Sequence, residues 1–145
     1  MRAISLWQPW ATFLVMGLKK TETRHWSTKF RGPLLIHASQ RNTGMRNKSL
    51  FTMAEKLCEN SAHKVPEKFM FGGYVGIVNV VDCKRIEDIK PDSLDWLLGN
   101  WGENRFGWIC ESPVAFKNIV PAKGKQGFWT VSDTELASIQ EMGNR

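Results

Sequence analysis

A short segment near the start of the chain brings together charged side chains that could grip a ligand. Within Gly17–Arg24 stand Lys19, Glu22 and Arg24. If this segment forms a strand, Glu22 and Arg24 are two residues apart and project from the same face. Lys19, close to the turn expected at Gly17, can reach the same place from the edge. Such a group can hold a phosphate through its Lys and Arg donors, while Glu22 accepts a hydrogen bond from the exocyclic amine of a base.

The spacing alone leaves two other interpretations open. Glu22 and Arg24 can simply pair across an exposed strand, an arrangement worth less than ~1 kcal/mol. Regular alternation along a strand would also place Lys20, rather than Lys19, on the side of Glu22. Either alternative would remove the binding role of the segment, so the choice needs further support.

Two pairs of polar and aromatic residues are candidates to stand near this group. Trp7 and Gln8 lie at the entry to the first expected helix, where Gln8 can read a base edge and Trp7 can stack on the base. His37 and Ser39 share one face of their expected strand. A single histidine in an apolar strand is, however, more often a hydrogen-bonded core group, so His37 has a structural alternative.

A third candidate is the segment Lys123–Gly127, which offers the ammonium groups of Lys123 and Lys125 and several backbone amides to a phosphate. A polar turn between strands would have the same composition, so both interpretations stand. Arg105, in a polar stretch before a strand, is a weaker candidate. No cluster of residues indicates a metal site, and we expect no metal and no cofactor.

The elements that must position these residues follow from apolar periodicity and from the turn residues. A turn at Arg31–Pro33 suggests that the second and third strands pair with each other. The pattern predicts one α+β domain over residues 1–145 with five or six short strands. The expected strands cover residues 3–6, 21–26, 34–39, 73–82, 106–111 and 127–131, and the expected helices cover 10–16, 50–60, 92–98 and the region from Ser132 or Asp133 onward.

Composition narrows the class of protein. The 145 residues carry a formal net charge of +6, which favours polyanionic partners such as nucleic acids. Seven tryptophans provide faces on which unstacked bases can lie, although most are expected to fill the core. Three widely spaced cysteines indicate reduced thiols. No apolar run is long enough for a membrane span or resembles a signal segment, so we expect a cytoplasmic protein that does not engage a membrane.

The segment Gly17–Arg24 fits the pattern G-x-K-x-x-E-x-R and, with Ser5–Ala11 upstream, resembles the signature of the ASCH domain family. The resemblance continues in the same order through Trp26, Arg31–Leu34, Val75–Gly76 and Lys123–Trp129, so it covers nearly the whole chain. It implies a PUA-like fold, a small mixed β-barrel of about five or six strands with helices at the rim and a cleft suited to RNA. It also favours Lys19 over Lys20 as the cation beside Glu22.

The resemblance implies two possible enzymatic activities as well. Some bacterial members of the family are amidohydrolases that remove the acetyl group of acetylcytidine, and others cut single-stranded RNA. In the amidohydrolases, a lysine matching Lys19 works with a threonine nucleophile at the position of Glu22. A carboxylate cannot replace that hydroxyl, although Thr21 and Thr23 are close by. RNA cleavage would use Lys19 to stabilise the developing phosphorane charge, with Glu22 or His37 moving the 2′-hydroxyl proton.

The sequence also lacks the nucleophile elbow, the zinc-protease motif, the P-loop and the dinucleotide-binding glycines. We therefore predict a nucleic-acid-binding protein that engages single-stranded RNA or a nucleotide, with a modified nucleoside as another possible ligand. The alternative is a metal-independent hydrolase, either a ribonuclease or an acetylcytidine amidohydrolase, in which Lys19 and Glu22 would be catalytic. The sequence leaves the oligomeric state open.

Overall fold

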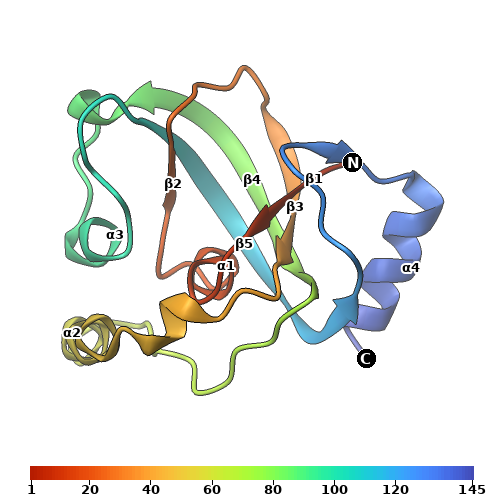
Figure 1. Cartoon of the computed structure of the whole chain (residues 1–145), viewed down its shortest axis with the longest axis horizontal. Helices are drawn as coiled ribbons and strands as arrows, with labels where there is room; N and C mark the ends of the chain where they lie inside the picture. The colour runs from red at the N-terminus through yellow and green to blue at the C-terminus, as the bar shows by residue number, and fades with distance from the viewer.

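The computed structural model describes all 145 residues and contains one six-stranded sheet (Figure 1). The strand order is β2-β5-β4-β3-β1-β6; β1 and β3 run parallel, and every other neighbouring pair is antiparallel. The predicted α+β class with a mixed sheet is confirmed. The sheet stays open between β2 and β6, so the barrel is not closed by hydrogen bonds. The strands are β1 (Arg2–Leu6), β2 (Thr21–Arg24), β3 (Gly32–Ala38), β4 (Gly73–Arg85), β5 (Phe106–Pro121) and β6 (Trp129–Thr130).

Four helices surround the sheet: α1 (Trp10–Val15), α2 (Lys48–Cys58), α3 (Ser93–Leu97) and α4 (Asp133–Gly143). In Figure 1, α2 and α3 lie on one side of the molecule and α4 lies on the opposite side. Gly17 follows α1 with φ +80°, which confirms its predicted role as the residue that ends this helix. All four helices lie at or close to the places that the sequence predicts. No helix is both long enough and apolar enough to span a bilayer.

The pairing of β2 differs from the prediction. β2 does not pair with β3; it pairs with β5, and Glu22 stands opposite Trp108. β3 instead lies between β1 and β4. The physical reason is the burial of Leu34–Ala38 throughout, because a strand that is covered on both faces needs the centre of the sheet rather than a single partner. β2 therefore forms one edge of the sheet.

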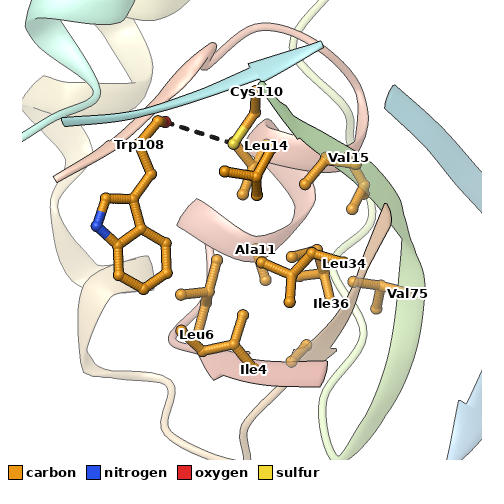
Figure 2. Close-up of a cluster of buried hydrophobic side chains, with 13 residues drawn as sticks. Ile4, Leu6, Ala11, Leu14, Val15, Leu34, Ile36, Val75, Trp108 and Cys110 are labelled. Carbon is orange, nitrogen blue, oxygen red and sulfur yellow. Dashed lines mark hydrogen bonds between the residues drawn. The ribbon is translucent and has the colours of Figure 1, made fainter. Parts of the chain in front are cut away.

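The main hydrophobic cluster lies between α1 and the sheet, where α1 packs against β3, β4 and β5. Figure 2 shows Trp108 beside Leu6 of β1, with the Sγ of Cys110 directed at the Trp108 carbonyl oxygen at 3.4 Å. Gly76 of β4 makes the close packing of α1 possible, because a Cβ at this position would meet the Val114 carbonyl oxygen and the Val15 side chain. Since α1 is fixed in this way, the turn that leads from α1 into β2 has a fixed starting point.

Two smaller clusters complete the core. One packs α4 against β4 and β5 and includes Tyr74 and Phe116. The other joins α2 and α3 to α1 through Phe13, Leu50 and Leu98. This last cluster matters for the site, because it holds α2 and α3 opposite the edge strand β2.

Candidate functional site

A cavity of about 550 Å³ lies on the side of the molecule that carries α2 and α3. Leu50 of α2 and Leu97 of α3 form part of its wall, and the wall opposite comes from β2. Its volume falls within the range of small-molecule and cofactor sites. The residues most relevant to its chemistry are three charged side chains, Lys19, Glu22 and Arg24, and three tryptophans, Trp7, Trp10 and Trp26.

The three charged side chains meet at the buried part of this cavity. The Lys19 Nζ lies 2.7 Å from Glu22 Oε1, and the Arg24 Nε lies 3.0 Å from Glu22 Oε2, so each carboxylate oxygen has its own cation. The side chains of Lys19, Glu22 and Arg24 are 4%, 10% and 20% exposed. Lys20 points elsewhere and pairs with Asp92 at 2.9 Å in an exposed position. The arrangement is therefore a buried group centred on Glu22, not an exposed ion pair.

The electrostatics of this group follow from its burial. Burial alone would raise the pKa of Glu22, but the charges of Lys19 and Arg24, together with their hydrogen bonds, outweigh burial and lower the pKa below its usual 4.5. Glu22 is therefore ionised at neutral pH, and the three residues together carry one positive charge.

Cys110 of β5 is buried close to this group. Burial and the charge of Glu22 raise the pKa of Cys110 to about 12, so its thiol stays protonated and is a poor nucleophile.

Asp95 of α3 fixes the start of β2, and sequence reasoning missed it. Its Oδ1 accepts hydrogen bonds from the backbone N–H groups of Lys20 and Thr21, both at 2.9 Å. Its Oδ2 accepts a third hydrogen bond from the Thr21 hydroxyl at 2.6 Å. The only signal in the sequence was a carboxylate inside a short apolar helix; Asp95 is 3% exposed. Through these bonds α3 determines where the following residues of β2 stand.

Aromatic rings border the charged group. The Arg24 guanidinium carbon lies 5.2 Å from the centroid of Trp26 and 5.8 Å from that of Trp108, so this cation contacts both rings. Trp26 is 46% exposed and Trp7 is 51% exposed. Arg41 covers the Trp7 ring at 4.0 Å. Trp10, at the start of α1, is half-buried and also lines the cavity.

Gln8 is buried and does not line the cavity. Its Nε2 donates to the Thr12 hydroxyl at 2.6 Å and to the Met70 carbonyl at 2.8 Å. Its Oε1 accepts from the Thr12 backbone N–H at 3.0 Å. The amide of Gln8 is thus occupied in tying the start of α1 to the segment before β4, and the structure does not bring it to the predicted base-reading position.

His37 lies apart from the charged group, in the core. Its Nε2 is 2.7 Å from the Ala122 carbonyl oxygen, which can only accept, so Nε2 carries the proton. Its Nδ1 then accepts from the Ser5 hydroxyl at 3.0 Å. The ring also makes edge-to-face contacts with Tyr74 and Trp129. The structural alternative for His37 is therefore the one observed.

The remaining predicted binding residues also stand outside the cavity lining. Ser39 is half-buried and accepts a hydrogen bond of 3.4 Å from the backbone N–H of Arg41. Lys123 and Lys125 are exposed in the segment that follows β5. The structure therefore brings together Trp7, Lys19, Glu22 and Arg24, and it leaves Gln8, His37, Ser39, Lys123 and Lys125 elsewhere.

Stability should depend on pH through His37. Burial lowers the pKa of His37 below its usual 6.5, although the hydrogen bond to Ala122 partly opposes this shift. Well above pH 6.5, His37 is neutral in both the folded and the unfolded chain, and protonation does not reduce the stability of the fold. As the pH falls from 6.5 towards the lowered pKa of the folded state, His37 takes up a proton in the unfolded chain only, and the free energy of unfolding decreases. We expect a loss of up to about 1.4 kcal/mol per pH unit in this window.

Urea unfolding between pH 8 and pH 5 measures this effect. The His37→Gln variant, which lacks the titrating ring, is the control, and the informative quantity is the difference in slope rather than the absolute stability. If the two free-energy curves run parallel across this range, the imidazole does not contribute as stated.

Two asparagines that the sequence did not single out also line the cavity. Asn47 caps α2, with its side chain accepting from the Leu50 N–H at 3.1 Å. Asn100 follows α3 and donates its backbone N–H to the Thr23 hydroxyl at 3.1 Å. Both stand in segments that looked like ordinary polar loops, and nothing in their local sequence shows that they converge on β2.

Comparison with curated proteins finds related sequences in two mammals. The chain is 29% identical over 129 residues to activating signal cointegrator 1 of Mus musculus and 29% identical over 126 residues to activating signal cointegrator 1 of Homo sapiens. In both cases the match covers 87% of this chain and 21% of the relative. The chain therefore spans about a fifth of the length of these curated relatives.

Comparison with solved structures finds the same fold in a bacterial protein. The crystal structure of ASCH from Zymomonas mobilis has a TM-score of 0.57 and 10% identity, over 97% of this chain and 94% of that one. A point variant of that protein gives the same TM-score and identity, over 97% and 96% of the two chains. At this identity the likeness establishes the fold alone. The ASCH domain model matches residues 4–119, most of the chain, and the chain therefore belongs to the ASCH domain family.

Proposed function

We propose that this protein binds single-stranded nucleic acid and takes one nucleotide into the cavity above Lys19, Glu22 and Arg24. The observation that carries the proposal is the ionised carboxylate held between two cations at the bottom of a cavity of about 550 Å³. The edge of a base presents donors and acceptors side by side, and a group with both signs of charge can match them.

The charged group keeps hydrogen-bonding capacity for a ligand. Lys19 has three N–H donors and uses one of them on Glu22. Arg24 reaches Glu22 through its Nε, and its two Nη groups have no hydrogen-bond partner in the protein. Glu22 can still accept through its remaining lone pairs. A carbonyl or ring nitrogen of a base can therefore accept from Lys19 or Arg24 while an exocyclic amine donates to Glu22.

The exposed tryptophans at the cavity favour an unpaired base. Trp7 and Trp26 each expose about half of their surface beside the charged group. A base inside a duplex is stacked and paired and cannot enter a cavity, whereas a single strand can place one base there and lay a neighbour on an indole ring. The net charge of +6 attracts the strand over a longer range. Both curated relatives are named activating signal cointegrator 1, and a nucleic-acid-related role for this chain is consistent with that name.

Fluorescence anisotropy with a labelled single-stranded RNA, its DNA counterpart and the duplex, all in EDTA, tests the proposal. We expect salt-dependent binding of the single strands. Arg24→Gln and Lys19→Ala should each weaken binding about tenfold or more, because each removes a charged donor worth roughly 1.5–3 kcal/mol. The matched control is Lys20→Ala, which removes the neighbouring lysine outside the cavity and should change Kd less than about twofold.

Binding that is absent, or that falls equally in all three variants, would overturn the proposal. The same samples, run on a denaturing gel and incubated with acetylcytidine, report on hydrolysis. Shortened RNA or released acetate that depends on Lys19 would assign a hydrolase rather than a binding module. Circular dichroism of each variant at the assay temperature shows whether a loss of binding reflects unfolding.

A further inference from the structure

Arg105, just before β5, contains an unusual buried donor. Its Nη2 donates to the Thr23 carbonyl at 2.8 Å, and its Nη1 lies 3.0 Å from His25 Nε2. Its Nε is buried and has no hydrogen-bond partner, and it is the only buried side-chain nitrogen or oxygen in the structure in that condition. A buried N–H without an acceptor costs free energy, so such a group calls for an explanation.

The charge around Arg105 is not balanced by the protein. Arg105 lines the cavity and takes part in no ion pair. The one carboxylate in the lining, Glu22, already has a cation on each oxygen. Arg105 Nη1 lies within 3.4 Å of both ring nitrogens of His25, and an imidazole supplies no negative charge in any of its usual forms. Arg105 therefore gives the cavity a positive charge that no carboxylate of the protein balances.

The fold places Arg105 next to the charged group. Its hydrogen bond to Thr23 attaches its guanidinium to the residue directly before Arg24. Arg24 in turn bonds Glu22 through its Nε and leaves its Nη groups unpartnered. Lys19, Arg24 and Arg105 all line the same cavity. A ligand that fills this cavity therefore meets both signs of charge at Glu22 and only positive charge at Arg105.

From this arrangement we infer that Arg105 and Arg24 form a phosphate subsite, distinct from the group centred on Glu22. Guanidinium groups bind phosphate oxygens through charge-assisted hydrogen bonds and match an anion that accepts from several directions. The inference rests on the proposed function and refines it: the preferred ligand is a nucleoside phosphate, with its base at Glu22 and its phosphate at Arg105. A free nucleoside would leave the surplus charge unmatched.

Isothermal titration with cytidine, cytidine 5′-monophosphate, cytidine 3′-monophosphate and inorganic phosphate tests the subsite. We expect at least one monophosphate to bind ten times more tightly than the nucleoside. A short oligonucleotide with and without a terminal phosphate shows whether a strand end or a free nucleotide supplies that group. Arg105→Gln should reduce the monophosphate-to-nucleoside ratio to threefold or less, and Arg105→Lys should give an intermediate ratio.

The control is Arg85→Gln, which removes an exposed arginine outside the cavity and should keep the full ratio. Melting temperatures identify any variant that has lost its fold. If Arg105→Gln is unfolded, the monophosphate-to-nucleoside affinity ratio of Arg105→Lys tests the subsite instead. Equal affinities for nucleoside and monophosphates, or an unchanged ratio in the Arg105 variants, would refute the subsite and leave the proposed function standing. If neither these ligands nor single-stranded RNA or DNA bind, the proposed function itself fails.

Discussion

Replacing Lys19 with methionine should lower the free energy of unfolding by about 3–5 kcal/mol, one of the two largest effects expected in this molecule. Methionine has a similar length, so little packing is lost. The loss comes from Glu22, whose side chain is 10% exposed and would keep a buried negative charge with only Arg24 as a partner. Urea unfolding at pH 7 measures the change.

A second substitution separates charge from packing. Adding Glu22→Gln to Lys19→Met removes the unpaired carboxylate, and we expect it to restore more than half of the lost stability. Lys20→Met, at an exposed position, should change stability by less than about 0.5 kcal/mol. If the double variant is as unstable as the single one, the charge of Glu22 is not the source of the loss.

Replacing Asp95 with alanine should cost about 3 kcal/mol and should also weaken nucleic-acid binding. The substitution removes the acceptor for two backbone N–H groups and for the Thr21 hydroxyl. Each buried donor left without a partner costs roughly 1–3 kcal/mol, and water that enters the vacated space offsets part of this cost. Since these bonds attach β2 to α3, their loss releases the strand that carries Glu22. Urea unfolding measures the loss of stability, and fluorescence anisotropy with labelled single-stranded RNA measures the loss of binding. Hydrogen exchange at the Lys20 and Thr21 amides shows whether β2 has been released.

Two controls accompany this prediction. Asp95→Asn keeps an oxygen that can accept from both backbone N–H groups, so its loss should be clearly smaller. Asp92→Ala, on the same helix, removes an exposed cap that accepts from the Asp95 N–H and should cost about 1 kcal/mol. Equal losses for Asp95→Ala and Asp92→Ala would show that the attachment of β2 does not depend on the Asp95 carboxylate.

Much of the fold could be read from local sequence because the signals are local. The β-branched run around Val75–Val81 predicts β4. Gly17 predicts the end of α1, because glycine readily adopts the positive φ that the structure shows there. The partner of β2 could not be predicted, since it is β5, more than eighty residues away, and pairing at that distance leaves no local pattern. Proximity along the chain suggested β3 and was wrong because β3 is buried on both faces.

The same distinction explains the candidate site. Lys19, Glu22 and Arg24 stand close together in the sequence, so their spacing was informative. Asp95 and Arg105 reach β2 only through the fold, and neither stood out as a strong candidate in the sequence. His37 shows the reverse case: it is near the charged segment in the sequence, but its ring nitrogens are hydrogen-bonded to Ser5 and Ala122 and it does not line the cavity.

The position of β2 at the edge of the sheet has an evolutionary consequence. One side of β2 is paired with β5, and the other faces α3 and the segment from Gly99 to Arg105, which forms part of the cavity wall. Loops tolerate insertions and deletions far better than the packed elements they connect. Lengthening or shortening this segment can therefore reshape the space available to a ligand while the core around Trp108 stays intact, which gives descendants of this protein a direct route to new specificities.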